Sequence, residues 1–261
     1  MSFRHLQLEV DGDGIALLTL NRPAKLNALN AELIGELDHA FTECAGRADI
    51  RGLILTGAGE KAFVAGADVA EIAEIDPLDA ERLSLRGQAV FRKLETMRKP
   101  SVAAINGFAL GGGLELAMAA TVRVASLNAR MGQPEVKLGI VPGYGATQRL
   151  PRLVGRAKAL ELLLSGDTVD AHEAYRTGLV NQVVELPELL PVSRAWLRKV
   201  LANGPIAVAL TMQAVDTGYD VGLDAGLRFE AMAFGFSAST SDCREGTRAF
   251  LEKRAPAFAG K

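Results

Sequence analysis

Apolar and polar residues alternate over the first twenty positions in a way that predicts two β-strands. Leu6, Leu8 and Val10 alternate with polar residues, and an apolar run covers 15–20. The Asp-Gly-Asp-Gly segment at 11–14 has the composition of a tight turn. The chain is therefore expected to open with a hairpin.

The following apolar positions change to helical spacing. Asn30 can cap a helix that ends near Gly46, and a short apolar strand follows at 53–55. Helical periodicity returns over 79–98, and a β-type run at 101–105 precedes a glycine-rich loop and another helix. This repeated order of strand and helix predicts an α/β protein.

The last third of the chain has a different pattern. From about Leu186 the strand patterns end, and helices are expected at 191–201, 206–217, 223–236 and 242–254. We therefore expect an α/β catalytic core over residues 1–190 and a helical C-terminal region over residues 191–261.

Composition limits the kinds of partner that the chain can have. Its 261 residues are 49% hydrophobic and 23% charged, which is enough apolar material for one substantial core with an appendage. The net charge is −2 with acids and bases interspersed, so no overall field favours nucleic acid or an anionic membrane. The first residues lack the pattern of a signal peptide, and no uncharged stretch reaches the roughly 18 residues of a membrane span. A cytoplasmic location is the expectation.

Cysteines and histidines give no sign of a metal site. Cys44 and Cys243 lack C-x-x-C spacing, and Cys44 falls on the apolar face of the first helix, which indicates a buried thiol. The three histidines lie far apart in sequence, without the helical spacing of zinc ligands. No metal is expected.

Three consecutive glycines, Gly111 to Gly113, join an apolar strand to an apolar helix in the segment 106–117. Glycine is unfavourable at a helix start unless the backbone needs unusual dihedrals or a group must approach closely. Free N–H groups there would suit a developing oxyanion. The segment is neither a Walker loop nor a dinucleotide-binding G-x-G-x-x-G. Close helix packing is the alternative explanation of the glycines.

Glu115 lies one turn into this helix, among apolar residues that indicate burial. Burial without a partner would raise its pKa and make it useful for proton transfer. Two alternatives are a helix-start acid favoured by the helix dipole and a buried ion pair with Arg123. Glu135 lies in a second irregular loop, 131–145, where an isolated acid is more often a turn or surface residue. A third loop, 61–68, ends at a predicted helix start, Asp68.

Four segments together resemble the enoyl-CoA hydratase (crotonase) family. They are A-G-A-D at 65–68, N-G-F-A-L-G-G-G-L-E-L-A at 106–117, G-Q-P-E-V-K-L-G-I-V-P-G at 132–143 and A-F-L-E-K-R at 249–254. The likeness runs in order over nearly the whole chain. It implies a crotonase-like spiral of ββα repeats, with a C-terminal helical region that assembles trimers and often a hexamer.

The resemblance also implies a reaction and a site. The reaction is reversible syn addition of water to trans-2-enoyl-CoA, in fatty acid β-oxidation or related acyl-CoA catabolism, without a cofactor because coenzyme A is part of the substrate. By motif, the catalytic pair maps onto Glu115 and Glu135, and the two amides of the oxyanion hole map onto Ala67 and Gly112. We expect Glu115 to activate the water and Glu135 to deliver the proton to Cα. The implied contacts to CoA and substrate are Ala24, Lys25, Leu26, Ala65, Asp68, Val69, Leu110, Gly143 and, from a neighbouring subunit, Phe250 and Lys253.

Some features depart from the family pattern or leave alternatives open. Ala120-Thr121 replaces a frequent Cys-Asp, and Gly145-Ala146-Thr147, with Tyr144 beside it, replaces a frequent Gly-Gly-Thr that borders the acyl pocket. Lys25 and Lys253 can equally be ordinary solvated lysines. An enoyl-CoA isomerase is the leading alternative activity. RNA binding, known in some relatives, is disfavoured because the first helix is acidic.

Overall fold

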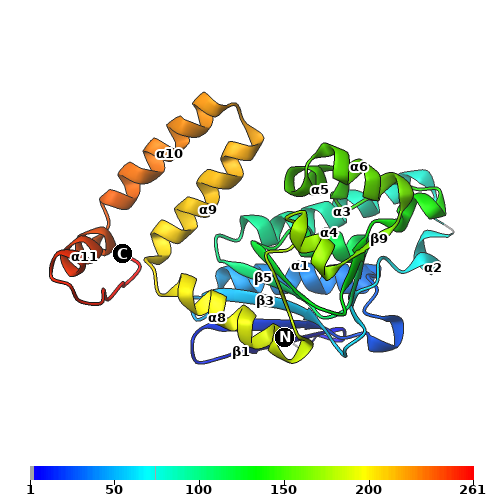
Figure 1. Cartoon of the computed structure of the whole chain (residues 1–261), viewed down its shortest axis with the longest axis horizontal. Coiled ribbons are helices and arrows are strands. Elements are labelled where there is room, and N and C mark those ends of the chain that lie inside the picture. The colour runs from blue at the N-terminus through cyan, green and yellow to red at the C-terminus, as the bar shows by residue number, and fades with distance from the viewer. Residues whose placement is uncertain (1–2, 74) are drawn as a thin grey trace. The chain divides into compact units, whose positions relative to one another are not determined.

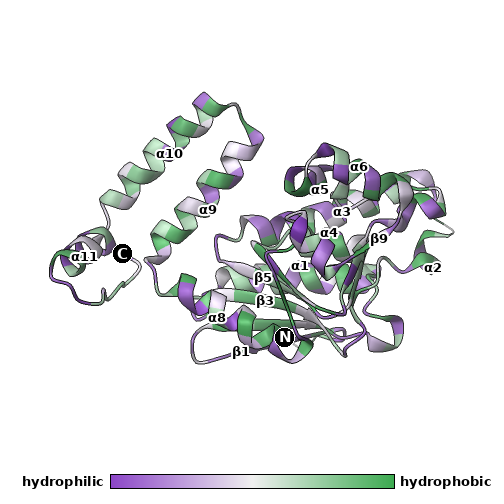
Figure 2. Cartoon of the chain, in the orientation of Figure 1, coloured by the Kyte–Doolittle hydropathy of each residue, from purple (hydrophilic) through white to green (hydrophobic). Residues whose placement is uncertain are grey.

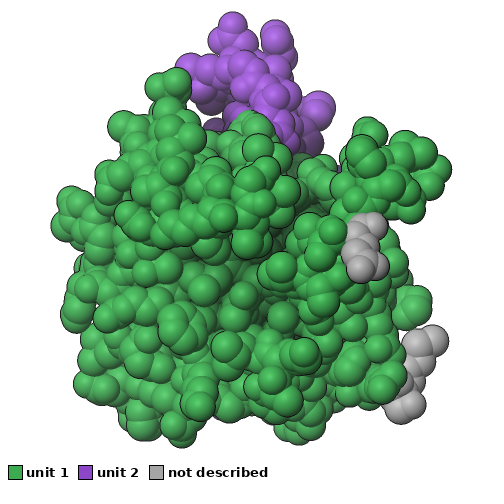
Figure 3. Space-filling view, turned by 90° about the vertical axis from the view of Figure 1, so that its right-hand side faces the viewer, with its two compact units in different colours: residues 1–97, 101–194 green, residues 98–100, 195–261 purple. Residues whose placement is uncertain are grey.

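The computed structural model describes residues 3–73 and 75–261, which form two compact units (Figure 3). The first unit comprises the described residues up to 97 together with 101–194, and the second comprises 98–100 and 195–261. Every strand belongs to the first unit, and the candidate catalytic residues lie there too.

The larger sheet of the first unit has six strands in the order β1-β2-β3-β5-β7-β10. The first pair is antiparallel, with Leu6 opposite Leu20, and this confirms the predicted hairpin. All the other pairs are parallel. The strands are β1 (Leu6–Val10), β2 (Ile15–Leu20), β3 (Gly52–Gly57), β5 (Ser101–Ile105), β7 (Val122–Ser126) and β10 (Gln182–Val184).

The smaller sheet has four short strands in the order β4-β6-β8-β9. Its first three strands are parallel and the last pair is antiparallel. The strands are β4 (Ala62–Val64), β6 (Phe108–Leu110), β8 (Arg130–Gly132) and β9 (Thr168–Asp170).

Successive turns of the chain contribute one strand to each sheet and then a helix, as Figure 1 shows. The series β3-β4-helix, β5-β6-helix and β7-β8-helix is the spiral of ββα repeats that the resemblance implied. The sequence pattern placed β4, β6 and β8 inside loops. Strands of three residues are too short for a periodic signal, and only pairing between distant segments defines them.

The helices of the first unit begin largely where local chemistry predicts. The side chains of Asn30, Asp76 and Asp170 cap the helices that follow them. The α-helices are α1 (Ala31–Gly46), α2 (Val69–Ile72), α3 (Pro77–Thr96), α4 (Gly112–Met118), α5 (Ala146–Val154), α6 (Arg156–Ser165) and α7 (Ala171–Arg176), and the 3-10 helices are η1 (Pro23–Lys25), η2 (Pro134–Leu138) and η3 (Leu186–Glu188). Cys44 is buried on the inner face of α1, as expected.

The C-terminal part is helical, as the sequence indicated. The helices are α8 (Leu189–Leu201), which crosses into the second unit, and α9 (Pro205–Asp220), α10 (Leu223–Ala238) and α11 (Ser241–Leu251). Helices α9 and α10 pack against each other, and both carry apolar residues along their length (Figure 2). Many of these are exposed in the single chain, among them Tyr219, Leu223, Met232 and Phe234. The predicted division between residues 190 and 191 and the role in assembly stay predictions.

Candidate active site

The corner where β6 enters α4 holds the three glycines of the sequence motif. Gly111 has φ +49° and donates its N–H to the carbonyl of Gly132 at 2.9 Å, which joins this corner to the end of β8. A β-carbon at Gly113 would lie 2.1 Å from the carbonyl oxygen of Val64. Close packing therefore explains Gly113. Gly112 is the first residue of α4, where a backbone N–H has no acceptor within the helix.

The amides of Ala67 and Gly112 donate to no acceptor within residues 3–73 and 75–261. For Ala67 the cause is the pairing of its loop: Leu29 donates to Gly66 and accepts from Asp68, as in a parallel bridge. In such a bridge the N–H of the central residue, here Ala67, points away from the paired segment. The two loops are adjacent, because β4 and β6 pair and a β-carbon at Gly111 would lie 3.8 Å from Cα of Gly66.

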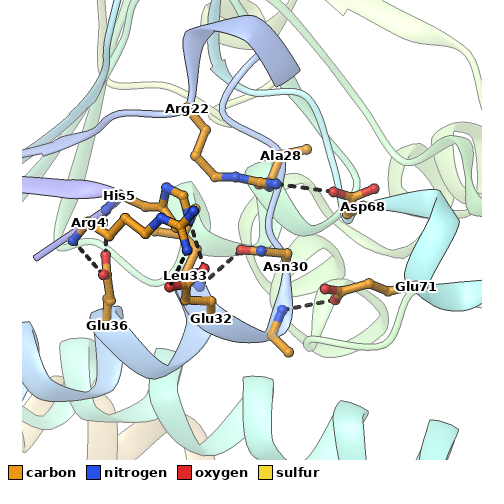
Figure 4. Close-up of polar contacts among 11 residues, drawn as sticks. Arg4, His5, Arg22, Ala28, Asn30, Glu32, Leu33, Glu36, Asp68 and Glu71 are labelled. Carbon is orange, nitrogen blue, oxygen red and sulfur yellow. Dashed lines mark hydrogen bonds and ion pairs between the residues drawn. The ribbon is translucent and has the colours of Figure 1, made fainter.

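The segment before α1 holds the Ala67 loop in place (Figure 4). Arg22 forms an ion pair with Asp68 at 3.3 Å, directly after Ala67. The carboxylate of Glu71 in α2 accepts from the backbone N–H of Ala31 at 2.9 Å. The position of the loop amide is thus set by contacts to the start of α1, more than thirty residues away in sequence.

Glu115 is buried, with 1% of its surface exposed. Its Oε1 accepts from the backbone N–H groups of Tyr144 and Ala146, each at 2.8 Å, where α5 begins. Both bonds fall on one oxygen, so Oε2 keeps its lone pairs for another group. Burial raises the pKa of Glu115, while these N–H groups and the nearby charge of Arg149 oppose the shift. The alternative partner Arg123 is elsewhere, because its guanidinium donates to backbone carbonyls of Leu179 and Ala120.

The contact between Glu115 and the backbone of Tyr144 is supported by an ion pair that the sequence did not predict. Arg149 of α5 pairs with Glu95 of α3, and its Nη1 also donates to the carbonyl of Tyr144 at 2.7 Å. Both side chains of the pair are largely buried. Because Tyr144 contributes one of the amides on Glu115, the pair fixes the loop that holds this carboxylate. Nothing in the linear sequence links residue 95 to residue 149.

Glu135, the second candidate catalytic carboxylate, lies in the 3-10 helix η2. The Gln133 amide, oriented with its nitrogen toward Glu135, donates to both carboxylate oxygens at 2.9 and 3.0 Å. Burial, together with the charge of Glu115, raises the pKa of Glu135 to about 7. A β-carbon at Gly111 would lie 2.8 Å from Oε1 of Glu135, so this carboxylate lies directly over the glycine corner.

The two glutamates thus meet at the start of α4. Glu115 is on that helix, and Glu135 lies against the residue before it. The electrostatic effect of Glu115 on the pKa of Glu135 follows from this closeness. Two titratable groups with raised pKa values lie beside two amides that have no acceptor among the described residues, and together they form a site for acid–base chemistry at an oxygen-bearing substrate.

The first unit brings several of the expected substrate contacts together. The N–H of Ala65 donates to the carbonyl of Leu26 at 3.0 Å, which joins the segment 24–26 to the segment 65–69. Lys25 is exposed at the end of η1. The remaining residues of this set in the unit are Ala24, Asp68, Val69, Leu110 and Gly143. Phe250, which is 82% exposed, and Lys253 belong to the second unit.

Among the described residues, no group of three or more histidine, cysteine, aspartate and glutamate side chains is placed to hold a metal ion. Within the same residues, no helix combines the length and the apolar character needed to cross a membrane.

Comparison with known proteins identifies the class that this fold and site define. Residues 11–261 match the family model described as enoyl-CoA hydratase/isomerase, and the chain belongs to this family. The short-chain-enoyl-CoA hydratase of Clostridium acetobutylicum is 46% identical over 254 residues, which cover 97% of each chain. The crotonyl-CoA hydratase of Syntrophomonas wolfei is 46% identical over the full length of both chains. A solved structure of an enoyl-CoA hydratase from Bacillus anthracis aligns with a TM-score of 0.95 at 39% identity, covering 99% of this chain and 100% of the other.

Proposed function

We propose that this protein is an enoyl-CoA hydratase, which adds water reversibly and with syn geometry to trans-2-enoyl-CoA to give 3-hydroxyacyl-CoA. Its place would be fatty acid β-oxidation or related acyl-CoA catabolism. One observation carries the proposal: two carboxylates with raised pKa values lie at the helix start where the amide of Gly112 has no acceptor in the part of the chain that the structure describes. The relatives named as hydratases support it.

The chemistry follows from these positions. The thioester oxygen accepts from the amides of Ala67 and Gly112, which stabilise the negative charge that develops there; loss of one such donor costs roughly 10²- to 10³-fold in rate. Ionised Glu115 takes a proton from water as the oxygen bonds to Cβ. The electron pair of the double bond moves to the enolate, and protonated Glu135 gives its proton to Cα. Because both carboxylates lie at the same corner of the chain, hydrogen and hydroxyl reach the same face of the double bond.

The proposed reaction also indicates which molecules this protein binds and how it assembles. Coenzyme A enters as part of the substrate, and neither a further cofactor nor a metal takes part. We propose a homo-trimer or homo-hexamer, supported by the exposed apolar residues of α9 and α10, with Phe250 and Lys253 reaching a neighbouring site. Nucleic acid and membrane are not partners in this proposal, and the location is cytoplasmic.

The test is hydration of crotonyl-CoA, followed by loss of the absorbance of the conjugated thioester. We expect fast turnover in the parent protein and a fall of about 10²- to 10⁴-fold in each of Glu115→Gln and Glu135→Gln. Glu60→Gln, which alters an exposed carboxylate away from the corner, is the matched control and should keep the parent rate. A parent protein inert toward enoyl-CoAs of all lengths would refute the proposal.

A double-bond shift is the second candidate, since the matched family model covers isomerases as well. Turnover in ¹⁸O-labelled water separates the two reactions, because only hydration places label in the product. RNA binding is disfavoured by the acids of α1, where Glu32 and Glu36 already accept from the chain start at residues 4 and 5 (Figure 4). Tight, salt-sensitive retention of RNA in a filter assay would contradict this.

A further inference from the structure

The ring of Tyr144 fills a gap beside the proposed reaction centre. The N–H of Tyr144 donates to Glu115, and its carbonyl accepts from Arg149, so the backbone is held on both sides. Only 6% of the residue is exposed. The ring meets Phe91 of α3 edge to face, with ring centres 5.5 Å apart and an interplanar angle of 76°. Backbone and ring therefore have one defined position.

Two glycines mark the opposite edges of this ring. A β-carbon at Gly87 of α3 would lie 2.3 Å from Cδ1 of Tyr144, so the ring or the helix would have to shift to accept one. A β-carbon at Gly112 would lie 3.1 Å from Cδ2, on the other edge. The ring thus spans the distance from α3 to the residue whose amide is to bind the thioester oxygen. Figure 1 shows α3, α4 and α5 in this part of the first unit.

The geometry of the proposed reaction indicates which part of the substrate would contact this ring. With the thioester oxygen on Gly112 and Cβ at the carboxylate of Glu115, we place the carbons beyond Cβ beside the loop that binds Glu115. That loop is the segment 144–146. The ring of Tyr144 therefore occupies space that a longer acyl chain would need.

We propose that Tyr144 sets the acyl-chain length of this enzyme, because its ring closes the space between Gly87 and Gly112 and limits the substrate to short enoyl thioesters. The inference rests on the proposed function. The ring acts by filling space and not as an acid. Burial, with the charges of Glu115 and Glu71, raises the pKa of Tyr144 to about 12, so the phenol stays neutral.

The experiment compares kcat/KM for crotonyl-, trans-2-hexenoyl-, trans-2-octenoyl- and trans-2-decenoyl-CoA. In the parent protein the value should fall along the series. Tyr144→Ala keeps the backbone N–H on Glu115 and removes the ring. It should raise kcat/KM for octenoyl-CoA in absolute terms and shift the octenoyl-to-crotonyl ratio by about tenfold or more, since one methylene in a pocket is worth roughly 10- to 200-fold.

Four further substitutions make the readout specific. Tyr144→Phe should keep the parent ratio, and Tyr144→Leu should give an intermediate one. Phe41→Leu shortens another fully buried aromatic, in α1, and should leave the ratio unchanged. Gly87→Ala should destabilise the parent but be tolerated in the Tyr144→Ala background, where it refills the space and lowers the octenoyl-CoA rate again.

Measurements of acyl-CoA binding test the role of Tyr144 independently of the proposed reaction. Calorimetry with butyryl-CoA and octanoyl-CoA measures chain-length preference without turnover, and Tyr144→Ala should tighten octanoyl-CoA about tenfold relative to butyryl-CoA. If crotonyl-CoA is not hydrated but this shift occurs, the proposed reaction is wrong and the role of Tyr144 holds. An unchanged ratio in both rate and binding, or a parent protein that takes octenoyl-CoA as well as crotonyl-CoA, overturns the inference.

Discussion

Activity should fall as the pH rises above neutrality, because Glu135 must be protonated to deliver its proton to Cα. Burial, together with the charge of Glu115, raises the pKa of Glu135 to about 7. Glu115 has to be ionised for the same turnover, so activity also falls on the acid side. The rate profile for hydration is therefore expected to be bell-shaped, with its alkaline limb belonging to Glu135.

The expected size of this effect follows from a single ionisation. Above the pKa, the protonated fraction falls about tenfold per pH unit, so kcat/KM near pH 9 should be ~1% of its plateau. The same shift affects stability. The folded pKa lies above the unfolded value of 4.5, so the contribution of Glu135 to stability is fully present below about pH 4.5 and is lost as the pH rises to about 7. The full shift corresponds to ~3 kcal/mol, which the half-buried position reduces to roughly 1–2 kcal/mol.

The assay is the initial rate of crotonyl-CoA hydration from about pH 5 to about pH 9.5, with urea unfolding over the same range. Glu135→Gln should lose the alkaline limb along with most of its activity, and should flatten the dependence of stability on pH. Glu60→Gln should reproduce the parent profile. A parent profile that is flat up to pH 9, or an alkaline limb retained in Glu135→Gln, would refute the assignment of the proton donor.

Three further substitutions probe how the site is held. Arg149→Gln removes a positive charge that lowers the pKa of Glu115, so the acid limb of the rate profile should move to higher pH, and Arg149→Lys should move it less. Gly111→Ala should cost ~10²-fold in kcat and roughly 1–3 kcal/mol in urea unfolding, because φ is +49° and the new carbon would lie 2.8 Å from the Glu135 carboxylate. Asn106→Leu leaves several buried backbone groups without partners and should cost about 3 kcal/mol in urea unfolding.

Each of these predictions has a control or a contradicting outcome. An unmoved acid limb in Arg149→Gln would restrict the ion pair with Glu95 to a structural role. Gly12→Ala adds a carbon with no atom within 4 Å and should change neither rate nor stability. A loss under about 1 kcal/mol in Asn106→Leu would mean that the loop rearranges to satisfy its own backbone.

Elements that depend on neighbouring residues could be predicted from the amino-acid sequence. Alternation at Leu6, Leu8 and Val10 with the turn at 11–14 defined the hairpin, and Asn30 marked the start of α1. The predicted strand at 101–105 coincides with β5. Such features follow from local dihedral preferences, caps and periodicity, which act over a few residues. The family resemblance supplied the spiral arrangement and the four residues of the site.

The contacts of Glu115 and Glu135 depend on the folded chain and could not be predicted from the sequence. The sequence allowed Glu115 to pair with Arg123, but the folded chain gives it two amides from the loop before α5. Glu135, in isolation a turn or surface acid, gains a raised pKa from burial and from the nearby charge of Glu115.

The short strands β4, β6 and β8 and the pair of Glu95 with Arg149 also join segments far apart in the chain. Burial and charge depend on groups brought together from such distant positions, and a linear pattern does not contain these distances.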